Sequence, residues 1–569
     1  MNFPHLHLLR SAALGALASL LAACGGGGGG GGGTPAPATV TISGRITFDR
    51  IGFDATLGNG LNPTAPVELP ARQVTVQAID ASNTSVLAET VTDTLGDYSL
   101  SVPSNRNLFI RARAEMIRTG TAPTWNFSVR NNTTAGTGDA LYALDGNAAS
   151  SGAANSTRNL RAPTGFGVNS YTGERAAAPF AILDTVFRAK ELVLTAAPTT
   201  AFPDLRMFWS SSNKPNVGNF CPDDGNINTS SYVVFGAGEV DGCGDPVATG
   251  IYLLGDFTTG DTDEFDQSVI AHEFGHYVED RFGRSDSIGG EHGGSATPLD
   301  LRVAFGEGWG NAFSGMVRND PIYRDSFNGA QDDFNIDLEA DDDVNEGWFS
   351  EASVWEILWD LFDATNEAGD TAALGFAPLY AVMTGAEKTT DAVTSIFTFI
   401  TGLEAANPTA MAAINDLVAG EDINGTGDFG TGETNDGNPA INNGVLPVYG
   451  DITFNDPPIT VCSRSPFGNT SGNKLGNRVF LRFNNTAQHL VTIQVTGSNG
   501  GGGVPATDPD IFVLRRGVLA AFGANEVPGS ETIDQVPLPD GLYIIEVYDF
   551  AIDGASNIPR CMTVSVTGT

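Results

Sequence analysis

Alternation of apolar and polar residues with a period of two marks two parts of the chain, one near each end. Gly, Asn and Pro separate the alternating segments. A period of two between turn residues predicts half-buried strands of an antiparallel sandwich. The segments are 40–46, 74–79, 98–102 and 108–112 near the start, and 479–483, 491–495, 511–514 and 542–547 near the end. We therefore expect one β-sandwich at each end of the chain.

Between the two alternating parts, apolar residues recur at the longer spacing that is typical of helices. The clearest predicted helix covers 266–280 and has Asp266 as its N-cap. Its apolar positions are Val269, Ile270, Phe274, Tyr277 and Val278. The pattern thus predicts a multidomain chain, with an α+β body at 116–447 between all-β sandwiches at 38–115 and 448–569.

The start of the chain has the pattern of an export signal. Arg10 precedes an apolar run, 11–23, which is shorter than the roughly 20 residues of a membrane span. The residues Leu21-Ala22-Ala23-Cys24 resemble the lipobox of bacterial lipoproteins, which implies a signal peptide at 1–24 and lipidation of Cys24. An ordinary signal peptide followed by a Gly-rich linker is the alternative.

Residues 25–37 are nine glycines followed by a short Thr-Pro-Ala-Pro segment, and they predict a flexible tether. The resemblance to lipoproteins implies an exported protein of the bacterial outer membrane or cell surface. Contact with the membrane is then expected only through the lipid anchor.

The composition of the chain narrows the classes of partner that it can bind. The 569 residues carry 29 Lys plus Arg against 67 Asp plus Glu, for a formal net charge of -38. Such a surface repels phosphate backbones, so nucleic acid is not expected as a partner. Hydrophobic residues make up 41% and charged residues 17%, which fits a folded, turn-rich protein rather than a disordered acidic one.

Four cysteines remain once Cys24 is set aside, and disulfides persist in an exported chain. Four cysteines allow three pairings. Pairing Cys221 with Cys243 and Cys462 with Cys561 keeps each bridge inside one expected domain. A metal site made by these cysteines is the weaker alternative, because the chain has no C-x-x-C spacing.

The predicted helix at 266–280 carries the pattern H-E-x-x-H. His272 and His276 are one turn apart on one face, so both imidazoles can reach a single zinc ion at about 2.1 Å. Glu273 lies about 100° round the helix from His272, where it can act as the general base for the attacking water. The alternative is a helix with two histidines that bind nothing.

A zinc site needs a third protein ligand, and its position distinguishes the classes of zinc peptidase. A metzincin has a histidine ten residues after the first one, but that position is Phe282. Glu307 follows His276 by 31 residues on a second helix-like segment, 300–318. Glycines in this segment predict close packing against the first helix, and Asn311, one turn after Glu307, can orient a histidine ligand.

With H-E-F-G-H at 272–276 and G-E-G-W-G-N at 306–311, the body resembles the thermolysin and fungalysin group of gluzincin metalloendopeptidases. The resemblance implies one zinc ion held by His272, His276 and Glu307, with Glu273 as the catalytic base. It implies hydrolysis of peptide bonds in protein or peptide substrates. It also implies that 230–236 and 250–255 are the strands before the metal helix, one of which binds extended substrate.

The two end domains also resemble parts of exported enzymes. Residues 92–98 resemble a turn of carboxypeptidase regulatory-like domains. Residues 508–512 and 538–543 resemble the pre-peptidase C-terminal domain of secreted bacterial peptidases. The fold expected from these resemblances is a gluzincin body flanked by two sandwiches.

Two departures from the family leave a second function open. Asn311 stands where the family usually has Asp, and no histidine follows Glu307 within the body to stabilise an oxyanion. Tyr323, Tyr380 and His292 are the candidates for that role. The alternative function is a catalytically weak or inactive surface-binding or adhesion protein on a gluzincin scaffold.

A second candidate cation site lies in 422–433, which follows a helical stretch and matches the spacing of an EF-hand-like calcium loop. The expected oxygen donors are Asp422, Asn424, Thr426, Asp428 and Glu433. The competing interpretation is an Asp-rich and Gly-rich linker before the C-terminal sandwich. If calcium does not bind there, the acidic run 332–343 is the next candidate.

Overall fold

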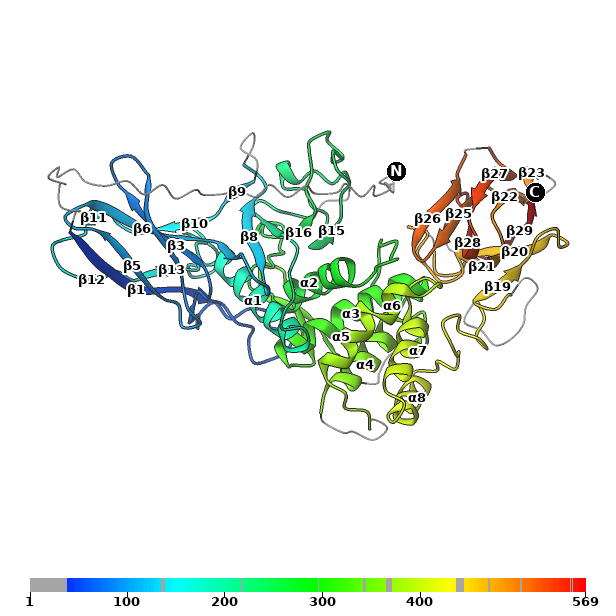
Figure 1. Cartoon of the computed structure of the whole chain (residues 1–569), viewed down its shortest axis with the longest axis horizontal. Coiled ribbons are helices and arrows are strands. Elements are labelled where there is room, and N and C mark those ends of the chain that lie inside the picture. The colour runs from blue at the N-terminus through cyan, green and yellow to red at the C-terminus, as the bar shows by residue number, and fades with distance from the viewer. Residues whose placement is uncertain are drawn as a thin grey trace, which may run out of the picture.

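The structure is a computed structural model that describes residues 38–134, 139–215, 218–294, 296–340, 344–364, 371–435, 445–468, 471–501, 504–525, 527–552, 554 and 556–569. The expected signal segment 1–24 with Cys24, the tether 25–37 and residues 341–343 of the acidic run lie outside these ranges. The chain is multidomain and strand-rich, with sheets at both ends and helices gathered between them (Figure 1). Among the described helices, none is long and apolar enough to span a membrane.

Two sheets form the N-terminal part. In the first, β1 pairs antiparallel with β2 and β5 and parallel with β12 and β13. In the second, the strand order is β10-β6-β3-β4, and β11 also pairs with β6. The bounds are β1 Thr39–Arg50, β2 Val67–Pro70, β3 Thr75–Asp80, β4 Val86–Val91, β5 Asp97–Pro103, β6 Asn107–Arg113, β10 Ala143–Asp145, β11 Ala149–Ser150, β12 Ser156–Thr157 and β13 Leu160–Ala162. The alternation places Ile42 and Ile46 in the core, as the period of two requires.

These sheets extend past the domain boundary that the sequence predicts at residue 115. Strands β10 to β13, at 143–162, return to pair with β1 and β6. Each of them has only two or three residues, which is too short to display an alternating pattern.

The next sheet belongs to the central body and has the order β15-β16-β14-β8-β7, with β9 on β8. Strands β8, β14 and β16 are parallel, and β15 is an antiparallel edge strand. The bounds are β7 Glu115–Arg118, β8 Trp125–Asn131, β9 Ala140–Leu141, β14 Leu205–Trp209, β15 Ser231–Val233 and β16 Gly250–Leu253. Strands are therefore present at both segments predicted before the metal helix.

The helices cluster beside this sheet (Figure 1). Their bounds are α1 Ala178–Ala196, α2 Gln267–Phe282, α3 Leu301–Arg318, α4 Glu351–Phe362, α5 Phe376–Thr384, α6 Ala386–Thr389, α7 Ile396–Ala406 and α8 Met411–Gly420, with a 3₁₀ turn η1 at Pro222–Asp224. A hairpin, β17 Ile322–Phe327 and β18 Asp332–Asp337, follows α3. Helix α3 lies between α2 and α4 and is buried along most of its length.

The C-terminal part is a sandwich of two sheets, with orders β19-β21-β28-β25-β26 and β20-β29-β22-β27. Its own core gathers the inward residues of both sheets, including Val479, Ile493 and Val547. The bounds are β19 Tyr449–Ile452, β20 Ile459–Ser465, β21 Arg478–Asn485, β22 His489–Thr496, β23 Asn499–Gly501, β24 Val504–Ala506, β25 Pro509–Arg515, β26 Val518–Gly523, β27 Ser530–Leu538, β28 Gly541–Asp549 and β29 Ser556–Gly568. The expected second sandwich is thus present.

Both expected disulfides are confirmed. Cys221 pairs with Cys243 in the central body, with Cα atoms 5.7 Å apart. Cys462 pairs with Cys561 between the adjacent strands β20 and β29. Each bridge restricts the unfolded chain, and by loop-closure entropy it contributes about 3 to 5 kcal/mol to the stability of the part that contains it.

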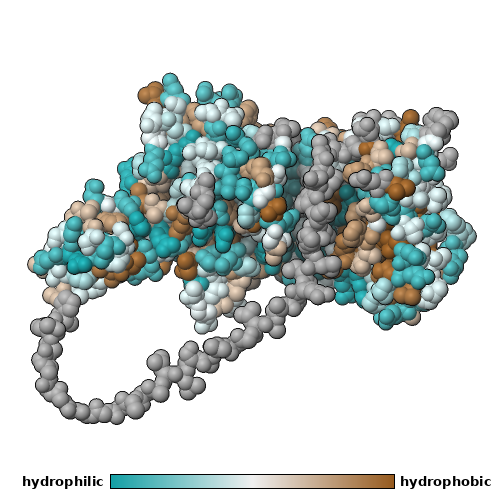
Figure 2. All heavy atoms as spheres, turned by 90° about the horizontal axis from the view of Figure 1, so that it is seen from above, coloured by the Kyte–Doolittle hydropathy of each residue, from teal (hydrophilic) through white to brown (hydrophobic). Residues whose placement is uncertain are grey.

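The three parts share packing. One continuous cluster of buried apolar residues runs from Val40 through the helices to Tyr449 and Ile544. Hydrophilic residues cover much of the face seen in Figure 2, with hydrophobic ones scattered among them in small groups. Because the buried apolar cluster includes Tyr449 and Ile544, the C-terminal sandwich is joined to the helical body by an apolar contact, and not by a tether alone.

Candidate metal centre

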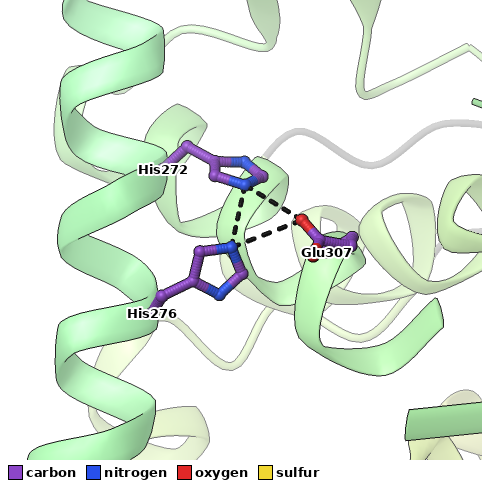
Figure 3. Close-up of side chains that lie close together, drawn as sticks. All are labelled: His272, His276 and Glu307. Atoms are coloured by element: carbon purple, nitrogen blue, oxygen red, sulfur yellow. Dashed lines mark hydrogen bonds and ion pairs between the residues drawn. The ribbon is translucent and has the colours of Figure 1, made fainter. Parts of the chain in front are cut away.

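Helices α2 and α3 bring together the three residues that the sequence predicts as zinc ligands. Nε2 of His272 lies 3.0 Å from Nε2 of His276. Oε2 of Glu307 lies 3.2 Å from Nε2 of His272 and 3.3 Å from Nε2 of His276. Figure 3 shows the two histidines projecting from one helix toward the carboxylate on the other. The ligand atoms of all three lie within 4.8 Å of one another.

Local sequence explains why the helices present these side chains. The spacing of four residues stacks both histidines on one face of α2. Asp300 is the N-cap of helix α3, and its side chain accepts a hydrogen bond from the backbone N–H of Arg302. Asp266 stands at the predicted N-cap of α2, but its side chain makes no capping bond there. It accepts instead from the backbone N–H of Ser326, at 2.6 Å.

The glycines of α3 permit close approach on two sides. A Cβ at Gly310 would come within 2.7 Å of the His272 ring, so this position admits only glycine at the present helix separation. Gly308 and Gly315 face α4 and its surroundings instead, where a Cβ would meet Val354 at 2.5 Å or Leu338 at 2.6 Å. At Gly306 the nearest atoms are 3.6 Å away. Close packing is thus required at three of the four glycines, and of these three only Gly310 faces the metal helix. A Cβ at Gly306 would meet Glu279 of that helix at an ordinary contact distance of 3.6 Å.

Each histidine has an oxygen partner at its other ring nitrogen. Nδ1 of His272 lies 2.9 Å from Oδ1 of Asn311, the contact that the sequence predicts for this amide. Nδ1 of His276 lies 3.8 Å from Oε2 of Glu279, which is 1% exposed. Sequence reasoning missed Glu279, although its spacing of three residues from His276 places it on the same face of α2. These oxygens leave both Nε2 atoms directed at the common centre.

Glu273 lies beside the ligand cluster and is 7% exposed. Its Oε2 accepts a hydrogen bond from the backbone N–H of Tyr232, at 2.6 Å, which ties the helix to edge strand β15. Burial raises the pKa of Glu273 above its ordinary value, and the nearby histidines partly oppose that rise. For Glu307 burial acts in the same direction, but the neighbouring histidine charges outweigh it and hold the pKa well below its usual range. The two carboxylates therefore have different acidities at one centre.

The three candidates for the oxyanion role are placed differently. Nε2 of His292 lies 3.4 Å from Oε2 of Glu307, although the residue comes from an exposed loop. The ring of Tyr323 lies 6.2 Å from the ring of His272, measured between centroids. The ring of Tyr380 packs against Phe376 instead. His292 and Tyr323 therefore stay as candidates by position, while the contacts of Tyr380 are with the hydrophobic core.

The His292 loop is held from two sides. Nδ1 of His292 lies 3.0 Å from Oε2 of Glu351, the first residue of α4. From the C-terminal sandwich, Nδ2 of Asn473 donates to the carbonyls of Gly289, at 2.9 Å, and Glu291, at 3.0 Å. Glu351 and Asn473 were not singled out from the sequence, because neither stands in a motif with the metal ligands.

The residues present fit a zinc ion. Two imidazole nitrogens and one carboxylate oxygen are the donor set of catalytic zinc sites, which keep one further position open. All three proposed ligands are largely buried. Because Gly310 has no side chain, it leaves room for the ring of His272, which faces Glu307. The hydrogen bond between His272 and Asn311 supplies the orientation that metal-binding imidazoles usually have, and the carboxylate of Glu279 faces His276 at 3.8 Å.

The predicted calcium loop does not gather its carboxylates in the structure. Oδ2 of Asp428 accepts a hydrogen bond from Thr390, and Oε1 of Glu433 accepts one from the backbone of Asn424. Among the described residues, the acidic side chains of 422–433 form no cluster with metal-ligand spacing. The acidic side chains of this loop therefore do not converge as an EF-hand requires, and among the described residues no helix directly follows Glu433.

No protein-family model matches the sequence, and no curated protein matches it. Solved structures give matches of low TM-score. The pre-peptidase C-terminal domain of a collagenase from Bacillus anthracis is 16% identical over 21% of this chain and 94% of that one, with a TM-score of 0.15. CorA, a surface-associated copper-binding protein of Methylomicrobium album BG8, is 13% identical over 21% and 99%, with a TM-score of 0.17.

PliG, a periplasmic lysozyme inhibitor from Aeromonas hydrophila, is 16% identical over 21% of this chain and 97% of its own, with a TM-score of 0.13. At these scores the likenesses carry no argument about function.

Proposed function

We propose that the chain is a zinc-dependent metalloendopeptidase of the gluzincin type, similar to the thermolysin and fungalysin group. The observation that carries the proposal is the convergence of His272, His276 and Glu307, with Glu273 beside them. Three protein ligands with a neighbouring free carboxylate are the parts that metal-assisted hydrolysis of a peptide bond needs.

When bound, zinc supplies a Lewis acid that polarises a water molecule and the scissile carbonyl. In this chain Glu273 takes the proton of the attacking water on its carboxylate and later gives it to the leaving amine. The N–H of Tyr232 holds one oxygen of this carboxylate, which leaves the other free for the water. The raised pKa of Glu273 suits a group that both accepts and returns a proton.

Substrate binding follows from the position of β15. This strand is the edge of its sheet among the described residues, and its Tyr232 contacts Glu273. An extended peptide that pairs with β15 would lie along the metal centre by β-augmentation. A histidine or tyrosine beside Glu307 then stabilises the negative charge that develops on the carbonyl oxygen, and His292 and Tyr323 are the residues in reach.

The proposed setting is outside the cytoplasm. The lipobox-like residues ending in Cys24 and the glycine tether support a lipoprotein that is anchored to a bacterial outer membrane. Proteins or peptides are the proposed substrates, and the two disulfides fit an oxidising compartment.

A binding or adhesion protein on the same scaffold is the second candidate. The observation that favours it is Asn311, because an amide on His272 raises the basicity of the ligand less than a carboxylate would. Such a protein would hold zinc without hydrolysing peptides.

Purified full-length mature protein separates the two candidates. Its zinc content is measured after removal of free metal, and casein hydrolysis is followed on the same sample. About one zinc per chain together with turnover supports the peptidase. Zinc without turnover supports the binding protein, and absence of zinc after loading contradicts both.

A further inference from the structure

A second group of ligand-type side chains lies at the start of the metal helix. Asp261 and Asp263 precede α2, and Asp325 lies on β17. Their carboxylate atoms lie within 4.8 Å of one another. Asp266, at the N-cap of α2, is fully buried, and burial together with the charges of Asp325 and Asp261 raises its pKa well above the ordinary value. Two buried residues, Asp263 and Asp266, therefore lie close to the partly buried Asp261 and Asp325.

Several oxygens in this group have no donor. Asp263 is 2% exposed, and its Oδ2 accepts from Ser230 while its Oδ1 has no hydrogen-bond partner among the described residues. The same holds for Oδ1 of Asp261, Asp266 and Asp325 and for Oγ1 of Thr262. A buried oxygen without a partner is costly, and native structures rarely keep several together unless an ion or water satisfies them.

The electrostatics point the same way. Burial raises the pKa of Asp263 well above its ordinary value, and the charges of Asp261 and Asp325 raise it further. Burial and the charge of Asp261 likewise raise the pKa of Asp325 to about 7. Ligand oxygens of Asp261 and Asp263 lie within 4.8 Å of each other. Carboxylates that oppose each other in this way are stabilised either by a shared proton or by a cation between them.

We propose that Asp261, Asp263 and Asp325 bind one calcium ion, separate from the zinc centre. All the donors are oxygens, which hard cations prefer and zinc does not require. Calcium tolerates the irregular geometry of donors that come from a loop and a strand, whereas magnesium requires a near-octahedral set. Asp261 also lines a cavity of about 570 Å³ that opens beside Phe257 and Phe327, which gives an ion a route from solvent.

A calcium ion at this site would join three segments that position the proposed catalytic residues, namely the loop with Asp261 and Asp263, strand β17 and helix α2. Oδ2 of Asp266 accepts from the backbone of Ser326 on β17, and Ser268 in the first turn of α2 accepts from the backbone of Arg324, at 3.0 Å. A cation bound by the loop and by β17 would fix this junction. His272 lies six residues beyond Asp266 on the same helix. Calcium is therefore expected to stabilise the helix that carries both histidines.

Equilibrium dialysis of the zinc-loaded protein against ⁴⁵Ca²⁺ tests the binding. We expect one calcium ion per wild-type chain, and an affinity that falls by roughly tenfold or more in the double variant Asp263→Asn plus Asp325→Asn. Asp422→Ala plus Glu433→Ala is the matched control and should bind calcium like the wild type. Wild-type protein without bound calcium, or equal binding in Asp263→Asn plus Asp325→Asn, would overturn the proposal.

Melting temperature supplies a second test that does not depend on the double variant folding well. Asp325 is only half-buried, so Asp325→Asn alone should fold. Without calcium this variant should melt above the wild type, because one repelling charge is gone. With calcium the order should reverse, because the wild type keeps its ligand. If calcium shifts both melting temperatures equally, the ion binds elsewhere and the proposal fails.

Discussion

Arg302, in the first turn of α3, donates a hydrogen bond at 2.8 Å to Oε2 of Glu546 on strand β28 of the C-terminal sandwich. Both side chains are almost fully buried, and Arg478 approaches the other oxygen of the same carboxylate. Glu307 lies less than two turns further along α3. The sandwich thus holds the helix that carries the third proposed zinc ligand.

Breaking this contact should destabilise the whole body. Glu546→Gln removes the buried carboxylate that Arg302 and Arg478 share, while Asp300 still pairs with Arg302, and the loss of one partner from such a group costs about 3 to 5 kcal/mol. We expect the free energy of unfolding to fall by that order in urea titration at pH 7. Asp451→Asn, which removes the exposed partner of Arg482, is the control and should change little. A small effect of Glu546→Gln would mean that the sandwich does not hold α3.

The carboxylate of Glu546 also makes the stability of the folded protein depend on pH. Burial tends to raise the pKa of Glu546, but the charges of Arg302 and Arg478 outweigh it and hold the pKa at about 2, below its ordinary value of 4.5. Because the folded pKa is lowered, the stabilisation is present above pH 4.5 and is lost as the pH falls toward 2. Unfolding followed from pH 6 to pH 2 should show a smaller loss of stability in Glu546→Gln than in the wild type.

Gly310 and Gly306 offer a matched pair on one helix. Gly310→Ala places a methyl group within 2.7 Å of the His272 ring, so α2 and α3 must separate, at a cost of about 1 to 3 kcal/mol. Gly306→Ala meets nothing closer than 3.6 Å and should be neutral or stabilising by about 1 kcal/mol. Zinc affinity by competition with a chromogenic chelator should fall only in Gly310→Ala. Equal affinity in both variants would contradict the role of Gly310.

Glu279 should support zinc binding through His276. Glu279→Gln removes the charge that faces Nδ1 of this histidine, and such outer contacts are worth about 10- to 100-fold in metal affinity. The folded state should survive, because the amide keeps the shape of the side chain. A zinc affinity like that of the wild type would show that Glu279 fills space without acting on His276.

The sequence predicted the convergence of His272, His276 and Glu307 better than it predicted the extent of the N-terminal sheets. The ligands are set by helical spacing and by one glycine-rich helix, so local pattern was enough to pair His272 and His276 with Glu307. Glu351 and Asn473 act from segments far away in the chain, and no local pattern indicates which long-range neighbours a loop will have. Strands β10 to β13 were missed because two or three residues show no period.

The calcium prediction illustrates the limits of spacing. Residues 422–433 match a loop pattern, yet Asp428 and Glu433 bond to protein donors. Asp261, Asp263 and Asp325 match no linear motif because Asp325 lies 62 residues after Asp263, and only the fold brings them together. Oxygen ligands from distant segments can therefore be found only from the tertiary structure.

His292 should act in catalysis and not in holding the metal. His292→Ala removes an imidazole that lies 3.4 Å from Glu307, while His272, His276 and Glu307 stay in place. We expect kcat for a peptide substrate to fall by about 10²- to 10³-fold, with zinc content and KM little changed. Tyr323→Phe is the companion variant, because this tyrosine is the other candidate. If zinc is lost in His292→Ala, the histidine is a ligand and its assignment to the oxyanion is wrong.

The most direct test of the proposed peptidase is the pair of wild type and Glu273→Gln, each assayed for zinc and for hydrolysis of casein. The amide keeps the hydrogen bond from Tyr232 but cannot take a proton from water. Both proteins should hold one zinc ion, and the rate should fall by roughly 10²- to 10⁴-fold in the variant. Comparable hydrolysis by both proteins, or no hydrolysis by zinc-loaded wild type, would contradict the assignment of Glu273 as the base of a zinc peptidase.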